Sequence, residues 1–216
     1  MVDKEEYNAV VIVTPADFKR VECNNQRIVK YLPVRKVLFV GSEELKELVG
    51  QSNLGDKAGF VNENDLIPFQ DVYNCMKDVM ADILLGRELP RGLVGWYYQQ
   101  FLKMKYSALC DDEYYMSWDG DTVPCKDFSM FDSEGRPYFD MKHEYHEEYF
   151  ITMGTILPYI KKIVDKSFIS EHMIFNSRYM KEMIEAIESN ENIKGTTFWE
   201  KILNSIRLEH IQENSF

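Results

Sequence analysis

Two aspartates separated by one glycine, Asp119, Gly120 and Asp121, directly follow a short apolar and aromatic run, Tyr114–Trp118. A run of that length and composition predicts a buried strand. Side chains along a strand alternate between its faces, so residues two positions apart can point the same way. Two carboxylates at a strand end offer the hard oxygen ligands that Mg²⁺ or Mn²⁺ prefers, and such an ion keeps positions for phosphate oxygens. We therefore predict that Asp119 and Asp121 hold a divalent metal that in turn binds a diphosphate.

The same residues allow other interpretations. Asp-Gly is a common turn dipeptide, and a hairpin turn would use it without any chemistry. A calcium loop fits poorly because Val123 stands where a third ligand is required. The run Asp119 to Val123 also resembles the nucleophile loop of haloacid-dehalogenase-type phosphatases, in which two aspartates flank one residue. That interpretation is weakened because the pair lies in mid-chain, after several predicted β-α units, and no second acidic loop follows it.

Composition narrows the class of protein. The 216 residues have the length of one domain, and 45% of them are hydrophobic, which is enough for a core. The formal net charge of −11 opposes binding to a nucleic-acid backbone, whereas a bound metal can reverse the local field for a nucleotide. The charged amino end carries no signal-peptide core, and no run is long enough to span a membrane. The four cysteines lack metal-ligand spacing, so we predict reduced thiols in a cytoplasmic protein without a transmembrane segment.

The elements that must position the aspartates alternate between apolar strands and amphipathic helices. Asp17 is expected to cap a helix that runs to Leu32. Strands are predicted at Ala9–Thr14, Val37–Val40 and Ala58–Val61, the first of them stopped by Pro15. This β-α-β-α-β order is typical of a parallel sheet whose ligands bind at the carboxyl ends of its strands. No Gly-x-Gly-x-x-Gly follows the first strand, which argues against a dinucleotide site.

Further polar residues lie on predicted helices and loops around the pair. The helix predicted from Gly95 to Lys105 carries Gln99, Gln100 and Lys103, which can bind a ligand or face water. A short apolar stretch near the carboxyl end contains Glu171 and His172. A helix capped by Asn176 or Ser177 follows it, and Thr197 with Glu200 matches a capping box at the start of a last helix.

Together these residues resemble a poorly characterised family of bacterial GT-A type glycosyltransferases, often associated with surface-polysaccharide synthesis. The resemblance runs from Val10 to about Ile206. It is carried by Gly95-Trp96-Tyr97 with the Gln-Gln-Lys residues, by Asp119-Gly120-Asp121-Thr122, and by His172-Met173-Ile174-Phe175. It implies a GT-A-like α/β fold of the nucleotide-diphospho-sugar transferases, with a mixed, mainly parallel sheet flanked by helices. It also implies Mn²⁺ or Mg²⁺ and transfer from a nucleotide-sugar donor to a glycan or small-molecule acceptor.

The resemblance also implies roles for individual residues. Asp119 and Asp121 would hold the metal, and His172 would lie near the acceptor or the metal. The residues expected to bind the donor are Thr14, Pro15, Gln99, Gln100, Lys103, Trp118, Asp119 and Asp121. An inverting enzyme needs a base near the acceptor hydroxyl, for which Glu171 and His172 are the candidates. The bland alternative for His172 is a core histidine with a satisfied hydrogen bond, and the alternative for the whole chain is a non-catalytic protein on a GT-A-like scaffold.

The domain expectation is one unit, residues 1–216, with a nucleotide-binding half at about 1–124 and an acceptor-side half at about 125–216. The last helix is expected to run from Thr197 to about Ile211, which leaves only a few residues after it. GT-A enzymes commonly close the donor site with a carboxyl-terminal segment. We therefore expect a chain truncated at that end, with an open cleft at the aspartates, weak donor binding and little transfer on its own.

Overall fold

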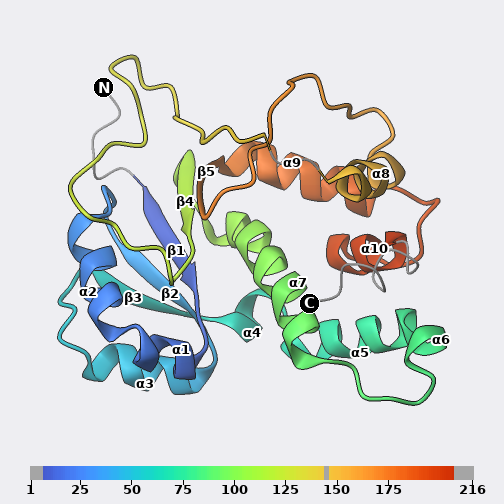
Figure 1. The fold of residues 1–216 in the computed structure, drawn as a ribbon, viewed down its shortest axis with the longest axis horizontal. Coiled ribbons are helices and arrows are strands. Elements are labelled where there is room, and N and C mark those ends of the chain that lie inside the picture. Colours follow the sequence, from blue (N-terminus) through green and yellow to red (C-terminus); the bar gives the residue numbers. More distant parts are fainter. Residues whose placement is uncertain (1–6, 144–145, 207–216) are drawn as a thin grey trace.

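The computed structural model describes residues 7–143 and 146–206. Its described part contains one five-stranded sheet in the order β3-β2-β1-β4-β5 (Figure 1). The strands are β1 (Asn8–Ile12), β2 (Val37–Gly41), β3 (Ala58–Asn62), β4 (Tyr114–Trp118) and β5 (His172–Asn176). The first four are parallel to one another, and β5 is antiparallel to β4. The predicted mixed, mainly parallel sheet flanked by helices is confirmed, and the three strands expected to share it do so.

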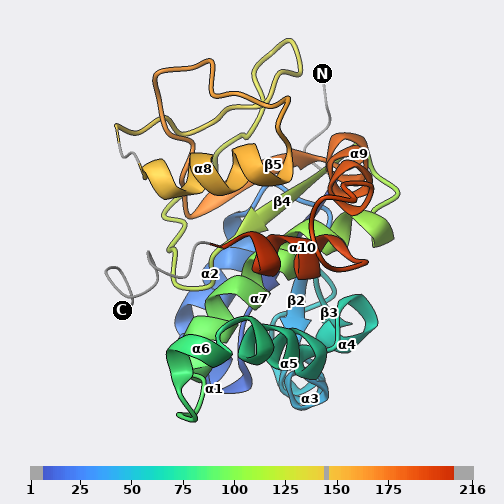
Figure 2. The same ribbon diagram turned by 90° about the vertical axis from the view of Figure 1, so that its right-hand side faces the viewer.

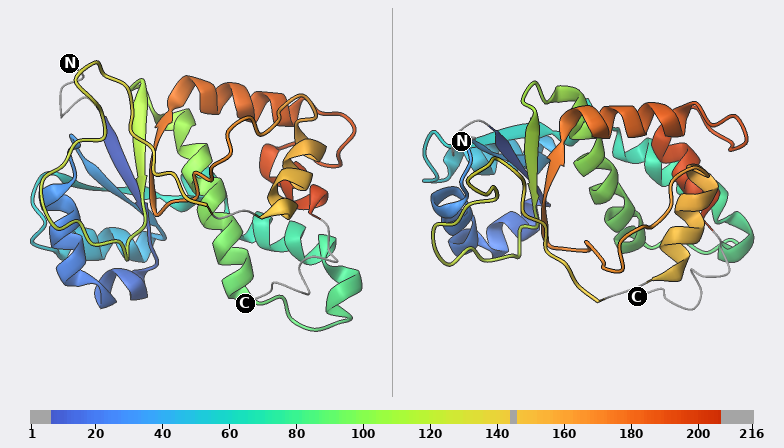
Figure 3. Two further views of the ribbon diagram at one scale, coloured as in Figure 1. Left: turned by 45° about the horizontal axis from the view of Figure 1, so that its top comes forward. Right: turned by 90° about the horizontal axis from the view of Figure 1, so that it is seen from above.

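Helices cover both faces of this sheet. They are α1 (Pro15–Arg20), α2 (Glu22–Tyr31), α3 (Glu43–Gln51), α4 (Glu63–Leu66), α5 (Phe69–Val79), α6 (Ala81–Leu84), α7 (Arg91–Lys105), α8 (Glu147–Ile156), α9 (Ser177–Glu188) and α10 (Phe198–Ser205), with a 3-10 turn η1 at Tyr106–Leu109. Helices α1, α2 and α3 lie on one side of the sheet, whereas α5, α7, α9 and α10 lie on the other (Figures 1 and 3). Among the described helices, none is long and apolar enough to cross a membrane.

Alternation along the strands divides the core into two clusters. In β1, Val11 packs with Phe18 of α1 and Ile28 of α2, whereas its neighbour Val10 packs on the opposite face with Phe101 and Leu102 of α7. Successive side chains of a strand point to opposite faces, so apolar residues at every position require helices on both sides.

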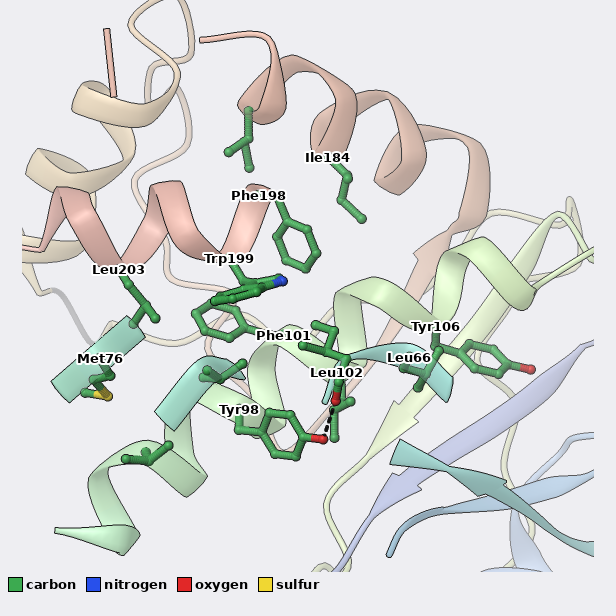
Figure 4. Packing of buried hydrophobic residues seen from close by; sticks show 14 of the residues in the cluster. Leu66, Met76, Tyr98, Phe101, Leu102, Tyr106, Ile184, Phe198, Trp199 and Leu203 are labelled. Atoms are coloured by element: carbon green, nitrogen blue, oxygen red, sulfur yellow. Dashed lines mark hydrogen bonds between the residues drawn. The ribbon is translucent and has the colours of Figure 1, made fainter. Parts of the chain in front are cut away.

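The larger cluster fastens α7 in place. Phe101 of α7 meets Phe198 of α10 edge to face, with ring centroids 6.0 Å apart (Figure 4). The Tyr98 hydroxyl donates to the Ile67 carbonyl at 2.6 Å, which ties α7 to the segment after α4 (Figure 4). Helix α10 in turn packs against α5, α8 and α9 (Figure 2). The helix that carries Gln99 and Lys103 is therefore held along its length by buried aromatic contacts.

Several helix ends follow local chemistry. Asn176 caps α9 by accepting from the Tyr179 N–H at 3.1 Å, and the capping box of Thr197 and Glu200 is present, as predicted. The expected cap at Asp17 is wrong: Thr14 accepts from the Asp17 N–H at 3.1 Å, because Pro15 already suits the first helical position. The predicted helix also divides into α1 and α2 at Val21. The final predicted helix ends at Ser205, with Ile206 as its carboxyl-terminal cap, and residues 207–211 of its expected range lie outside the described residues.

Candidate functional site

The candidate site lies where the order of strands reverses. From β1 the chain builds β2 and β3 on one side, then places β4 on the other side of β1. The carboxyl ends of β1 and β4 are neighbours at this switch point, with Val10 paired to Ser117. Thr14 and Pro15 follow β1, and Asp119 follows β4. Open α/β sheets bind ligands in the crevice outside the strand ends at such a point, so two separate parts of the predicted site meet there.

Asp119 is held from two directions. Its backbone N–H donates to the Glu171 carbonyl at 2.9 Å, continuing the pairing of β4 with β5. Its Oδ1 accepts from Lys103 Nζ at 2.7 Å and from Gln99 Nε2 at 3.5 Å. The Lys103 side chain is 12% exposed and that of Asp119 27%. The structure thus brings Gln99 and Lys103 of α7 to the aspartate, as expected, while the described hydrogen bonds do not connect Gln100 to this group.

The Asp-Gly-Asp residues form a tight turn whose second aspartate projects outward. The Thr122 N–H donates to the Asp119 carbonyl at 3.0 Å, and Asp121 is exposed. Within the described chain, neither the Asp121 carboxylate nor Asp119 Oδ2 accepts a hydrogen bond. The turn does not connect paired strands, because the antiparallel neighbour of β4 is β5, much later in the chain. The hairpin alternative is therefore wrong.

Helix α2 supports this turn, which sequence reasoning missed. Asn24 Nδ2 donates to the carbonyls of Gly120 at 2.7 Å and Thr122 at 3.2 Å, and Arg27 Nε donates to the Pro124 carbonyl at 3.1 Å. The sequence pattern could have identified Asn24 as buried, because it lies at helical spacing between the apolar residues Val21 and Ile28. A buried amide at such a position requires partners, and here they belong to the site.

Trp118 has a different place from the one expected of a donor-binding residue. Its side chain is 4% exposed and belongs to the cluster under α1, α2 and α3. Its Nε1–H donates to the Thr122 carbonyl at 2.9 Å, so it also fixes the turn from within. The His172 ring packs on it, with centroids 4.9 Å apart, and Phe128 packs at 5.8 Å. Because neighbours along a strand point to opposite faces, Trp118 and His172 lie on the face away from α7 and the Asp119 carboxylate.

His172 and Glu171 have separate polar partners. His172 Nε2 lies 3.6 Å from Asp140 Oδ2, to which the Ser170 hydroxyl donates at 3.1 Å. His172 Nδ1 is buried and finds no hydrogen-bond partner among the described residues, so the satisfied-core alternative does not describe this nitrogen. Glu171 is paired with Lys142 at 3.0 Å, and hydrogen bonds from its own backbone and from Lys142 lower the pKa of its carboxyl.

The donor set for a metal is small. Over residues 7–143 and 146–206, no group of three His, Cys, Asp or Glu side chains is arranged to hold a metal ion. Lys103 occupies Oδ1 of Asp119, which leaves Oδ2 and the Asp121 carboxylate as hard oxygen ligands on one exposed turn. This pair fits an ion such as Mg²⁺, which uses one or two carboxylates and completes its shell with water and substrate oxygens.

Comparison with known proteins gives a family. A family model described as "Family of unknown function (DUF6492)" matches residues 34–214, a range that includes Lys103, the Asp pair and His172. The chain belongs to the DUF6492 family. The match begins after β1, so Thr14 and Pro15 lie outside it.

Other comparisons add less. No curated protein matches the DUF6492 chain in sequence. One similar solved structure is the apo form of the glycosyltransferase GlyE from Streptococcus pneumoniae TIGR4, at 10% identity and a TM-score of 0.40. That match covers 96% of this chain and 43% of the GlyE chain, so this chain spans less than half the length of GlyE.

Proposed function

We propose that the chain is a metal-dependent glycosyltransferase that moves a sugar from a nucleoside-diphosphate donor to a glycan or other acceptor. Surface-polysaccharide synthesis is the setting that the sequence resemblance implies. The observation that carries the proposal is the position of Asp119 and Asp121, which follow β4 at the switch point beside the end of β1.

The charges around the turn suit a diphosphate. A chain of net charge −11 repels phosphate overall, so a phosphate site in it needs local positive charge. Lys103 provides one such charge at the turn. A metal on Asp119 Oδ2 and Asp121 would supply Lewis-acid neutralisation of the leaving diphosphate. Thr14 and Pro15, at the end of β1, are proposed to border the nucleotide, and Gln99 and Gln100 to reach it from α7.

Lys103 has two compatible tasks. A lysine ammonium has three N–H donors, and only one is needed for the bond to Asp119 Oδ1. The remaining donors can bind a phosphate oxygen without loss of the ion pair. Without the lysine, the half-buried aspartate would lack a compensating charge, which is strongly unfavourable. Lys103 is thus proposed both to hold Asp119 and to contact the diphosphate.

The proposed base is His172, with Glu171 as the second candidate. The Asp140 carboxylate lies 3.6 Å from His172 Nε2, where it can orient the imidazole ring. Glu171 is already paired with Lys142, and its lowered pKa makes it a weaker base. Transfer through an oxocarbenium-like centre requires the base on the acceptor side. Glu171 and His172 stand at the start of β5, next to the turn, and the His172 ring lies on the face opposite the Asp119 carboxylate.

Ligand binding tests this proposal directly. Thermal shift and calorimetry with a set of nucleoside diphosphates and nucleotide sugars are expected to show binding that requires Mn²⁺ or Mg²⁺. Asp121→Asn is expected to remove this metal-dependent binding. The ligand-free variant is expected to keep its melting temperature, because the exposed Asp121 carboxylate forms no hydrogen bond or ion pair among the described residues. Asp82→Asn, an exposed carboxylate on α6, is the matched control and is expected to bind normally.

Three results would contradict the proposal in different ways. Nucleotide binding that does not require the metal and is unchanged in Asp121→Asn would mean that the Asp-Gly-Asp turn is not part of the donor site. Capture of fluoroberyllate at Asp119 would support the phosphatase alternative. A folded protein that binds none of the nucleotides would support the non-catalytic alternative. A nucleotide-sugar hydrolysis assay with Mn²⁺, for this chain and for any longer natural form, then tests turnover.

A further inference from the structure

Exposed apolar side chains are concentrated in one part of the chain. Ten of the fifteen large hydrophobic residues that are exposed in the described structure fall between residues 138 and 169. Isolated exposed hydrophobic residues are ordinary, whereas a contiguous set marks an interaction surface. Ile163 is 92% exposed and Tyr159 69%. The other eight are Tyr138, Phe139, Met141, Tyr149, Ile160, Val164, Phe168 and Ile169.

Tertiary pairing brings two parts of this set together. Lys142 and Ser167 exchange backbone hydrogen bonds of 2.9 Å in both directions, so residues 138–142 run antiparallel to residues 166–170. The rings of Phe139 and Phe168 pack across this pair with centroids 6.0 Å apart. Beyond α8 the chain returns through residues 157–165 toward β5 (Figure 3). We call residues 138–142 and 157–170 the apolar arm.

The apolar arm adjoins the candidate site. Asp140 of the arm lies against His172, and Lys142 is paired with Glu171. The Glu171 carbonyl accepts the Asp119 N–H at 2.9 Å. Glu171, which directly follows the apolar arm in the chain, therefore joins the arm to the turn of the two aspartates through this backbone hydrogen bond.

The charge of the arm differs from that of the chain. Residues 157–170 contain Lys161, Lys162 and Lys166 against one acid, Asp165, in a chain of net charge −11. Lys161 is exposed, and its side chain forms no hydrogen bond or ion pair among the described residues. Lys162 donates to the Lys166 carbonyl and lies over the Phe150 ring, 5.1 Å from its centroid. The three lysines thus share one segment with the exposed aliphatic side chains, and in the other half of the arm Lys142 balances Asp140.

We propose that the apolar arm docks the protein on an anionic lipid bilayer. Lysines are attracted to the negative headgroups, and apolar side chains enter the boundary between headgroups and acyl chains. The aliphatic members decide the occupant: Ile163 and Val164 offer a sugar no hydrogen bond, but they partition into acyl chains. Docking of this kind is interfacial and reversible, and it does not depend on the proposed glycosyl transfer.

Vesicle flotation tests this docking with the 216-residue chain. Phosphatidylcholine vesicles with and without phosphatidylglycerol are compared at low and physiological salt. Binding is expected only with the anionic lipid and is expected to weaken with salt. Ile163→Ser is expected to weaken binding about ten-fold by loss of apolar burial, and Lys161→Gln about five-fold by loss of one charge.

The matched control removes an exposed hydrophobic residue elsewhere. Leu85, after α6, is 80% exposed and has φ 48°, a conformation that Asn adopts readily, so Leu85→Asn should bind vesicles normally. Circular dichroism and melting temperature verify that each variant is folded. The proposal is overturned if the folded chain does not float with anionic vesicles, or if Ile163→Ser and Lys161→Gln leave flotation unchanged. It is also overturned if light scattering shows a dimer that Ile163→Ser dissociates, which would assign the arm to a second copy. No nucleotide is present, so failure here leaves the transfer proposal intact.

Discussion

Among single residues, Lys103 makes the most informative substitution. It pairs with Asp119 from a side chain that is 12% exposed, so its charge competes with any cation for the same carboxylate. Lys103→Met removes one positive charge next to Asp119. The variant is therefore expected to bind Mn²⁺ more tightly, because the charge no longer repels the cation, and to bind a nucleoside diphosphate more weakly, because the charge no longer attracts the phosphates. Removal of one partner from a half-buried pair should also cost about 1–3 kcal/mol of unfolding free energy.

Electron paramagnetic resonance of Mn²⁺ and nucleotide calorimetry measure the two affinities of this variant. Lys105→Met, on the same helix and without an ion pair among the described residues, is the control and should change neither affinity. A fall in both affinities would mean that Lys103 positions Asp119 and does not compete for it.

The sequence predicts the polar residues grouped around Asp119 better than the residues that hold the Asp-Gly-Asp turn in place. The family resemblance groups Asp119 with Gln99, Gln100 and Lys103, and Gln99 and Lys103 do contact Asp119 Oδ1. The resemblance implies that Trp118 binds the donor, but alternation along β4 turns its side chain toward the other face. Asn24 was missed because a helical pattern shows that a residue is buried and does not show which distant carbonyls it will meet.

At the scale of elements, the start of α10 makes stability depend on pH. Burial alone would raise the pKa of Glu200, but hydrogen bonds from the backbones and hydroxyls of Thr197 and Thr196 lower it below the ordinary 4.5. A carboxyl whose pKa is lower in the folded state adds stability above its unfolded pKa, and loses it as the pH falls through the folded pKa. Glu200→Gln is therefore expected to cost about 1 kcal/mol at pH 7, a difference that shrinks below about pH 4.5.

Urea unfolding at several pH values between 7 and 3 measures this difference. Glu191→Gln, an exposed residue shortly before the same helix, is the control and should show no such trend. A constant gap between Glu200→Gln and the wild type down to pH 3 would contradict the role of the ionised carboxylate.

Gly41, the last residue of β2, is a position at which an added side chain is expected to destabilise the fold. A Cβ on Gly41 would lie 2.7 Å from the Val13 carbonyl oxygen and 2.7 Å from Leu45 Cδ2. A backbone carbonyl cannot move aside cheaply, so Gly41→Ala is expected to cost about 1–3 kcal/mol. Gly50→Ala in α3, where nothing lies within 4 Å, should instead gain about 0.5–1 kcal/mol. Chemical denaturation of both variants measures the contrast, and equal effects would contradict it.

Strands were easier to predict than their partners. The bounds of β4 follow from a run of aromatic and apolar residues that only Ser117 interrupts, and the sequence predicts β3 from Ala58 onward. The stretch that contains β5 was identified as apolar, but its direction and its neighbour depend on contacts across 53 intervening residues, 119–171. Periodicity reports which face is buried and contains no information on which strand lies alongside.

For the whole molecule, the larger core cluster couples stability to the site. Phe101 is buried between the sheet and Phe198 of α10, on the helix that carries Lys103. Phe101→Ala is expected to cost about 3–5 kcal/mol, a large share of the roughly 5–15 kcal/mol that a domain of this kind has. Leu109→Ala, half-exposed after α7, should cost less than about 1 kcal/mol.

Urea denaturation measures both variants. A cycle with Phe198→Ala is expected to show a coupling of about 0.5–1.5 kcal/mol between the two rings. Additive effects of the two substitutions would mean that the rings only fill space. Loss of Mn²⁺-dependent nucleotide binding in Phe101→Ala, at a temperature where it remains folded, is also expected, because α7 would shift.

The late arrival of β5 also affects how the protein is made. One edge of β4 can pair at once with β1, which is synthesised long before it, whereas the other edge must wait for residues 119–171 and then β5. At about 5–20 residues per second, that delay lasts about 3–10 s. During it, the uncharged aromatic segment Tyr-Tyr-Met-Ser-Trp presents unpaired backbone groups to other nascent chains. Ribosome stalling within this interval would therefore favour aggregation over completion of the sheet.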